Sequence, residues 1–262
     1  MNKKFFLKML VAICMITMVV VSFTACNKID TMGRIQENNV VIMGTNAEFP
    51  PFEYRNERGE IDGFDVAIAK AIAEELGVEL KIEDMAFDAL LNSLNAGRID
   101  FVAAAVSVTE ERLKNNDFSI GYYTAGQSIM IRKGDDTIQG KEDLVGKIVG
   151  VQQGTTGDLE ASDIEGVGEV RRYMKALDAV MDLKAGRINA VVVDESPAEI
   201  FVRRNDDLMI LEERLTDEEY AIAVRKGDKE LVEAINRAIQ DLKDSGRYDA
   251  YYDQYISDFV NE

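Results

Sequence analysis

The sequence of 262 residues contains no histidine and no tryptophan, only two cysteines and only three prolines. Histidine and cysteine are the usual ligands of protein-bound zinc, so their scarcity nearly excludes a zinc site. Nucleic-acid binding requires clustered basic surface, and a formal net charge of −18 argues against it. We therefore expect no metal, no other cofactor and no nucleic-acid partner. The charge itself does not indicate the charge of a ligand.

Runs of acidic residues such as Asp217-Glu218-Glu219 have two interpretations. They are either a solvated face of the protein or part of a metal site. Because Asp and Glu are rarely buried without a partner, we expect a solvated face here.

Residues 1–25 have the composition of an export signal. Three lysines (Lys3, Lys4 and Lys8) precede residues 9–21, which are apolar apart from Thr17. This apolar stretch is shorter than the roughly 20 residues that span a bilayer, so a signal peptide is favoured over the alternative, a short transmembrane helix.

The two cysteines are Cys14, inside this signal, and Cys26, directly after it. Removal of the signal leaves one thiol and hence no intramolecular disulfide. The segment Ser-Phe-Thr-Ala-Cys resembles a bacterial lipoprotein signal, although Phe23 stands where a leucine-like residue is usual. The resemblance implies acylation of Cys26, a membrane anchor through that lipid, and a flexible polar tether over residues 26–38.

Two stretches about ninety residues apart are nearly alike: FDALLNSLNAGRIDFVAAAVS (87–107) and LDAVMDLKAGRINAVVVDES (177–196). Each has the pattern of an amphipathic helix, a Gly-Arg stop and a β-branched strand. One unit used twice predicts two similar α/β lobes. Ligands of open α/β sheets bind beyond the carboxyl ends of the strands, and small-molecule sites favour domain interfaces, so we expect a cleft between the lobes.

No proline lies in an obvious linker, so we expect the lobes to be joined by extended strands that cross within 124–130 and 215–223. Lobe 1 then comprises residues 39–124 plus 222–262, and lobe 2 residues 125–221. Periodicity predicts strands over 40–44, 80–82, 99–104, 129–132, 148–151, 190–193 and 220–224, and helices over 65–76, 88–97, 230–243 and 248–255. In the last helix a stripe of tyrosines is interpreted as packing rather than a ligand cage.

Three segments resemble the solute-binding proteins of polar amino-acid ABC importers (family 3): 44–77, 107–123 and 144–160, supported by the segment around Asp194. The resemblance implies a two-lobed periplasmic-binding-protein fold of type II, each lobe a β-sheet flanked by helices, joined by two crossing hinge strands. It further implies a monomer outside the cytoplasm that captures a polar amino acid by hinge closure and delivers it to a membrane permease.

A free amino acid carries a carboxylate and an ammonium, and burying each charge costs several kcal/mol unless it is paired. Arg112 is the candidate cation, since its guanidinium can grip a carboxylate through two bonds; the alternative is a surface pair with Glu110 or Glu111. Asp194 is the candidate anion because it follows a buried strand; the alternative is the N-cap of the next helix. The resemblance assigns these two residues to the ligand carboxylate and ammonium.

Ser107 and Thr156 can offer hydroxyl or backbone N–H groups to the carboxylate, Thr156 from a Gly-Thr-Thr-Gly segment expected to open a helix. Relatives often have Ser or Gly ahead of the position of Ser107. Here Ala105 leaves only its backbone carbonyl to contribute.

The ligand side chain is expected to lie between Phe49 and Phe87, as the resemblance implies. Asn46 stands where binders of cationic amino acids commonly have Asp, which favours a neutral polar side chain, and Gln152 is equally uncharged. Glu48 or Glu53 could supply a carboxylate instead.

Two rival functions remain. One is a cleft enzyme of the same fold, similar to an arogenate or cyclohexadienyl dehydratase, which would need an acid or base with a tuned pKa. Histidine is absent, and Glu48 and Glu53 are the acidic residues of the matched segments without a binding role, so we expect no enzyme. The other is the sensing domain of a receptor, which is disfavoured because no membrane helix or signalling module follows Glu262.

Overall fold

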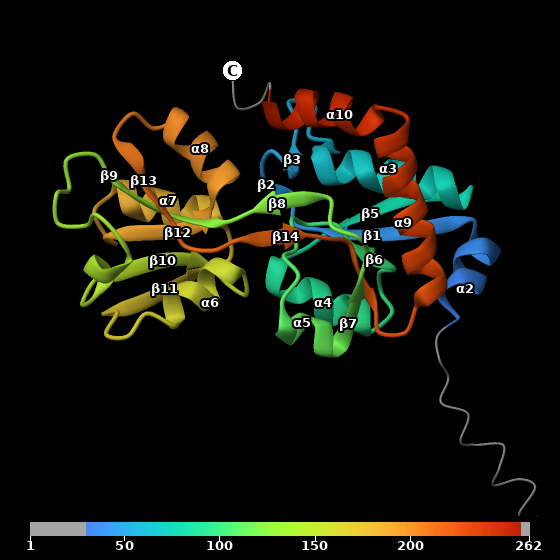
Figure 1. Ribbon diagram of the computed structural model, residues 1–262, viewed down its shortest axis with the longest axis horizontal. Coiled ribbons are helices and arrows are strands. Elements are labelled where there is room, and N and C mark those ends of the chain that lie inside the picture. The colour runs from blue at the N-terminus through green and yellow to red at the C-terminus, as the bar shows by residue number, and fades with distance from the viewer. Residues whose placement is uncertain (1–29, 258–262) are drawn as a thin grey trace, which may run out of the picture. The chain divides into compact units, whose positions relative to one another are not determined.

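Two five-stranded sheets of the same topology organise the described part of the chain, residues 30–257 of a computed structural model (Figure 1). Their strand orders are β5–β1–β6–β15–β7 and β11–β10–β12–β9–β13. In each sheet the first three strands are parallel, and the fourth runs antiparallel to both of its neighbours. The prediction of two α/β lobes is confirmed.

Lobe 1 is built on a β–α–β–α–β core that ends in a short strand. Helix α3 buries the apolar face set by Ile68, Ile72 and Leu76, and Gly77 ends it in the left-handed conformation. Figure 1 shows α3 and α9 on one face of the sheet and α4 on the other. The elements are β1 (Val40–Thr45), α3 (Phe64–Leu76), β5 (Glu79–Asp84), α4 (Phe87–Asn95), β6 (Phe101–Val102), α5 (Glu110–Asn115), β7 (Asn116–Phe118), β15 (Ala223–Arg225), α9 (Lys229–Asp244) and α10 (Arg247–Tyr252).

Lobe 2 repeats this core, and strands β9 and β13 complete its sheet as β15 and β7 complete that of lobe 1. Its central strand β12 is buried along its whole length because it has neighbours on both sides and helices over the sheet. The elements are β9 (Gln127–Arg132), η1 (Lys141–Leu144), β10 (Ile148–Gln152), α6 (Thr156–Ser162), β11 (Glu169–Tyr173), α7 (Ala176–Lys184), β12 (Ala190–Asp194), α8 (Glu195–Arg203) and β13 (Leu208–Arg214).

Glycines stand at matching places in the two cores. A Cβ on Gly44 of β1 would lie 2.2 Å from Ile99 Cδ1, and one on Gly150 of β10 would lie 2.5 Å from Ile188 Cδ1. The absence of a side chain at both positions lets the segment after the second helix pack closely on the first strand. The internal repeat therefore extends from sequence to packing.

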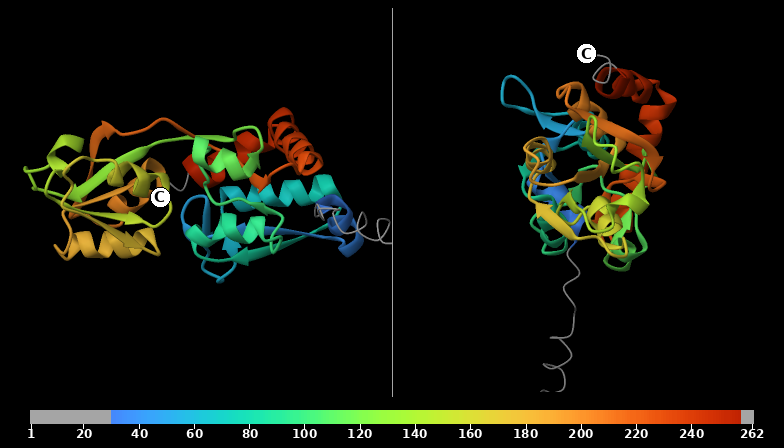
Figure 2. Two further views of the ribbon diagram at one scale, coloured as in Figure 1. Left: turned by 90° about the horizontal axis from the view of Figure 1, so that it is seen from below. Right: turned by 90° about the vertical axis from the view of Figure 1, so that its left-hand side faces the viewer.

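Two crossing strands join the sheets (Figure 2). β8 (Tyr123–Ala125) and β14 (Glu218–Tyr220) pair antiparallel, with Glu218 opposite Ala125. The chain leaves the first sheet after β7, crosses through β8 into β9, and returns through β14 to β15. The single strand expected over 220–224 is therefore two strands, because the chain changes sheets between them.

Other predicted elements differ in extent. The strand expected over 99–104 pairs only at β6, since the backbone turns away and Ala105 takes a positive φ of 48°. The proline-containing loop after β1 holds a small sheet of β2 (Glu48–Phe49), β3 (Glu53–Arg55) and β4 (Ile61–Asp62).

The prediction of a flexible tether over residues 26–38 is wrong for residues 31–38. Residues Thr31–Asn38 form helix α2, which contacts β1 and α9 and buries Thr31 and Ile35. An apolar residue that meets a complementary surface outweighs the polar composition that suggested coil. The expected signal at 1–25 and Cys26 lie outside the described residues.

The tyrosine stripe packs as expected. The rings of Tyr248 and Tyr252 lie edge-on to Phe64, at centroid distances of 5.5 and 6.2 Å. Tyr255 is buried and donates to Asp62 at 3.0 Å. Within residues 30–257 no helix is long and apolar enough to cross a membrane.

Candidate binding site

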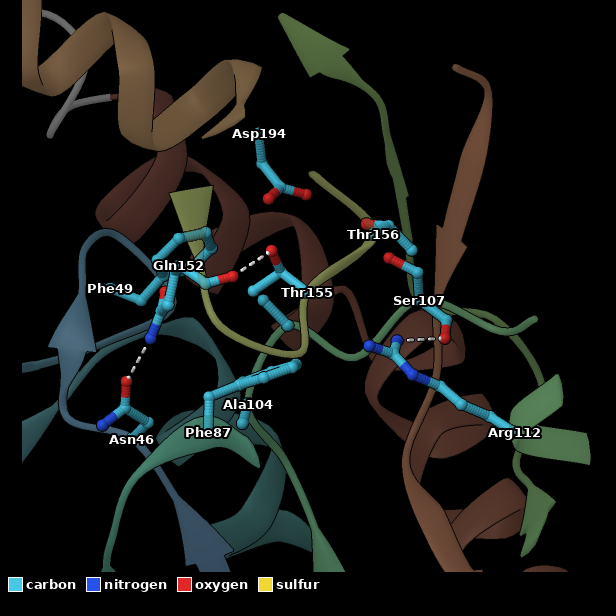
Figure 3. Close-up of a pocket in the computed structure, with 11 residues that line it drawn as sticks. Asn46, Phe49, Phe87, Ala104, Ser107, Arg112, Gln152, Thr155, Thr156 and Asp194 are labelled. Carbon is cyan, nitrogen blue, oxygen red and sulfur yellow. Dashed lines mark hydrogen bonds between the residues drawn. The ribbon is translucent and has the colours of Figure 1, made fainter. Parts of the chain in front are cut away.

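One pocket between the lobes collects every residue that the sequence singled out for ligand binding (Figure 3). It lies at the carboxyl ends of β1, β6, β10 and β12, as the topology predicts. Its lining comprises Asn46, Phe49, Phe87, Ala105, Ser107, Arg112, Gln152, Thr156 and Asp194, together with Ala104 and Thr155, which neighbour predicted residues but were not themselves predicted to bind.

Arg112 enters the pocket from the first turns of α5. Thr109 caps this helix by accepting a bond from the Arg112 backbone N–H at 3.2 Å. The guanidinium donates through Nη1 to the Ser107 carbonyl at 2.7 Å and through Nη2 to the Gly154 carbonyl at 3.1 Å, and it lies 5.6 Å from the centre of the Phe87 ring. Arg112 thus links lobe 1 to lobe 2 and still has other N–H groups for a ligand.

The alternative surface pairs for Arg112 are not formed. Glu111 pairs with Lys114 instead, and within residues 30–257 no carboxylate forms an ion pair with Arg112. Burial lowers the pKa of Arg112, and the nearby negative charges of Glu218 and Asp194 oppose this shift. The guanidinium remains a cation at neutral pH because its ordinary pKa is so high.

Asp194 enters from the opposite lobe, at the end of β12 (Figure 3). It occupies the N-cap position of α8, but its side chain does not cap the helix; it accepts a hydrogen bond from the Tyr220 hydroxyl. Asp194 as a whole residue is 5% exposed, and within the described ranges no lysine or arginine forms an ion pair with it. Burial raises the pKa of Asp194 to about 7, helped by the charge of Glu218 and opposed by hydrogen bonds from Tyr220 and Gln127.

The hydroxyls of Ser107 and Thr156 were expected to be available to a ligand carboxylate, but they donate to a carboxylate of the protein instead. Both donate to Oε2 of Glu218, Thr156 at 2.8 Å. Since a hydroxyl has only one proton, neither is free to donate to a ligand in this arrangement. Their backbone N–H groups are the donors that remain.

The interpretation of the acidic run is wrong for its middle residue. The side chain of Asp217 is 92% exposed and Glu219 is exposed, but Glu218 is half-buried and accepts three hydroxyl bonds. Alternation along a strand puts Glu218 on the same face as buried Tyr220, and this was the available signal. It was missed because the strand was expected to begin at residue 220.

The remaining walls come from both lobes. Phe49 is 7% exposed and packs on Phe52 with centroids 6.4 Å apart. Asn46 donates to the Met85 carbonyl and accepts a bond from Gln152 Nε2, both at 2.9 Å. The two amides predicted to meet the ligand side chain therefore bridge the lobes.

The two glutamates considered as alternative carboxylates do not line this pocket. Glu48 pairs with Lys175 of lobe 2, outside it. Glu53 is buried, and burial together with the charges of Asp65 and Asp194 raises its pKa well above the ordinary value. In the described part of the chain no group of histidine, cysteine or acidic residues is arranged to hold a metal ion.

Comparison with known proteins gives consistent matches. A family model described as bacterial extracellular solute-binding proteins, family 3, matches residues 41–258. The arginine-binding extracellular protein ArtP of Bacillus subtilis (strain 168) is 36% identical over 248 residues, which are 93% of this chain and 94% of that protein. The L-cystine-binding protein TcyJ of Escherichia coli (strain K12) is 34% identical over 228 residues, 86% of this chain and 85% of that protein. Among solved structures, the arginine-bound form of truncated ArgBP from T. maritima is 48% identical, with a TM-score of 0.78, and the match covers 80% of this chain and 99% of that one.

Proposed function

The chain belongs to the bacterial extracellular solute-binding proteins of family 3, and on this premise we propose that it is the substrate-binding component of an ABC importer for a free polar amino acid. One observation supports this most strongly. A half-buried cation, Arg112, and a buried anion, Asp194, line one pocket from opposite lobes, and neither has an ionic partner among the described residues. A zwitterion supplies both missing partners.

The carboxylate of the amino acid binds Arg112 and the backbone N–H groups of Ser107 and Thr156. Its ammonium binds Asp194 and the carbonyl of Ala105. Charge-assisted bonds of this kind are worth about 1.5–3 kcal/mol each, which offsets the cost of burying the ligand's charges.

The side chain of the amino acid lies between Phe49 and Phe87 and reaches the amides of Asn46 and Gln152. Neither amide provides a formal charge, but both offer donors and acceptors, so a polar side chain is matched better than an aliphatic one. The relatives named for arginine and cystine fit this polar class.

Binding is coupled to closure of the lobes. We take residues 39–124 plus 222–262 as lobe 1 and 125–221 as lobe 2, with β8 and β14 as the hinge. Because Arg112 and Asp194 lie in different lobes, only the closed state pairs both charges of the ligand. A ligand therefore shifts the open–closed equilibrium by its difference in affinity for the two states.

The pocket binds its ligand without chemical change. Asp194 is the one carboxyl group among the described residues that line it, and the ammonium occupies that group. A dehydratase would need a further acid or base in contact with the substrate. Release of product from arogenate or a related substrate would contradict this assignment.

The protein is exported and anchored to the membrane by lipid on Cys26, and it works as a monomer beside its permease. The family of extracellular binding proteins and the sequence that precedes Cys26 support this placement. Cys26→Ser is expected to release the protein from cell membranes on fractionation. A variant that remains in the membrane fraction would contradict the anchor.

A thermal-shift panel of the common amino acids and cystine tests the main proposal. An amino acid present at a hundred times its dissociation constant stabilises the protein by about 2.7 kcal/mol. We expect a clear rise in melting temperature for one or a few polar amino acids. A panel in which no amino acid changes the melting temperature would contradict the proposal.

A further inference from the structure

Glu218 lies on the hinge strand β14 and contacts both lobes. Its Oε2 accepts bonds from the hydroxyls of Ser107 in lobe 1 and Thr156 in lobe 2, the latter at 2.8 Å. Its Oε1 accepts a bond from Thr216 at 2.6 Å. The carboxylate does not line the ligand pocket, so these bonds lie behind the pocket wall.

A second layer of bonds fixes the direction of these hydroxyls. The side-chain Nε2 of Gln127 donates to Thr156 Oγ1 at 3.0 Å, and its backbone N–H donates to Thr216 Oγ1 at 2.9 Å. Each threonine oxygen therefore accepts one hydrogen bond from Gln127 and donates one hydrogen bond to Glu218. Thr156 and Thr216 are held as donors toward the carboxylate.

We propose that Glu218 is a positioning residue that clips the two lobes together and holds the backbone of Ser107 and Thr156 in place at the closed pocket. The proposal rests on the proposed function only in that these two residues bind a ligand. The clip itself is a property of the ligand-free protein.

A carboxylate suits this role because it accepts several hydrogen bonds and donates none. The neighbouring acids do not share it. Glu219 follows on the same strand but is exposed. This neighbour provides a matched control with the same side chain and the same secondary structure.

The test measures the distance between the lobes without any amino acid present. Spin labels are placed at Asp241→Cys on α9 and Glu142→Cys on η1, two exposed sites in different lobes, in the full chain with Cys14 and Cys26 replaced by serine. Pulsed electron–electron double resonance then gives the distribution of distances between the two labels.

We expect E218A to move this distribution toward longer distances and E218Q, which keeps one acceptor oxygen, to move it less. E219A is expected to match the unsubstituted protein. A distribution for E218A that coincides with that for E219A would overturn the proposal.

A variant in lobe 2 covers the case in which E218A does not fold. T156V removes one donor to the clip and nearly preserves the shape of the side chain. It is expected to lengthen the distances as well, and an unchanged distribution would contradict the clip. Because no ligand is used, a failure of amino-acid binding leaves this test unaffected, and the two proposals can fail separately.

Discussion

The two lobes share a β–α–β–α–β core but differ in the segment at and after its third strand. β1–α3–β5–α4–β6 in lobe 1 corresponds to β10–α6–β11–α7–β12 in lobe 2, with equivalent strand order and equivalent glycines. After β6 the chain turns at Ala105 and reaches α5, which presents Arg112. β12 instead runs straight into Asp194. One fold, used twice, thus places opposite charges in one pocket, Asp194 at the end of β12 and Arg112 on the helix that follows β6, so the segment after the third strand decides the charge that each lobe contributes.

Arg112 and Asp194 also differ in how strongly their ionisation depends on pH. Arg112 remains charged at any physiological pH, whereas burial raises the pKa of Asp194 to about 7. We therefore expect ligand binding to depend on pH through Asp194 in lobe 2 and not through Arg112 in lobe 1. This difference can be tested from either side.

Loss of the anion is expected to have the largest effect. Asp194→Ala removes the proposed partner of the ligand ammonium, and truncating one member of a buried charge pair typically costs about 2–5 kcal/mol. Titration calorimetry with the amino acid found by the panel should show affinity weakened by roughly thirtyfold or more. Asp206→Ala, at an exposed position of the same lobe, should bind normally. Equal affinities for the two variants would remove Asp194 from the site.

Loss of the cation is expected to be next. Arg112→Ala should weaken binding at least tenfold, about 1.4 kcal/mol. We expect a smaller loss than for Asp194→Ala because the proposed backbone N–H donors to the ligand carboxylate remain. Arg112→Lys should recover part of this loss, since it restores the charge but not the fork. The control is Arg98→Ala, an exposed arginine of lobe 1. An unchanged dissociation constant for Arg112→Ala would show that lobe 1 binds in another way.

Acidification is expected to weaken binding through lobe 2 alone. The raised pKa of Asp194 means that this carboxyl takes up a proton as pH falls through about 7, and a neutral carboxyl cannot pair with an ammonium. Affinity should fall by up to about tenfold per pH unit below 7, and binding at pH 7 should release protons. Calorimetry in two buffers of different ionisation enthalpy measures that release. A flat affinity between pH 5 and pH 8 would contradict the assignment.

The ion pair at the edge of the interface should matter least. Glu48 and Lys175 join the lobes beside the pocket, but the lysine side chain is 50% exposed. Exposed pairs contribute about 0.2–1 kcal/mol, so Lys175→Ala should change affinity less than about fivefold. A double-mutant cycle with Glu48→Ala measures the coupling, and a larger value would mean that this pair helps to set closure.

The sequence predicted the two lobes and the strand-end position of Asp194 because the evidence for them is local, whereas the resemblance to family 3 supplied most of the predicted pocket lining, including Phe49 and Phe87. Helix and strand periods, the repeated Gly-Arg stop and residues at strand ends can all be read without knowing which segments meet. It did not predict the contacts of Glu218, because two of the three hydroxyls that donate to it, those of Ser107 and Thr156, come from distant parts of the chain. It also missed α2, whose helix depends on the surface that buries Ile35.

The most direct test compares the bound amino acid with two of its derivatives. The methyl ester lacks the carboxylate charge and the N-acetyl form lacks the ammonium. Titration should show both bound at least tenfold more weakly than the parent. In Arg112→Ala the penalty for the ester should largely disappear while the penalty for N-acetylation stays. If either derivative binds the unsubstituted protein as tightly as the parent, the protein does not hold a zwitterion between Arg112 and Asp194.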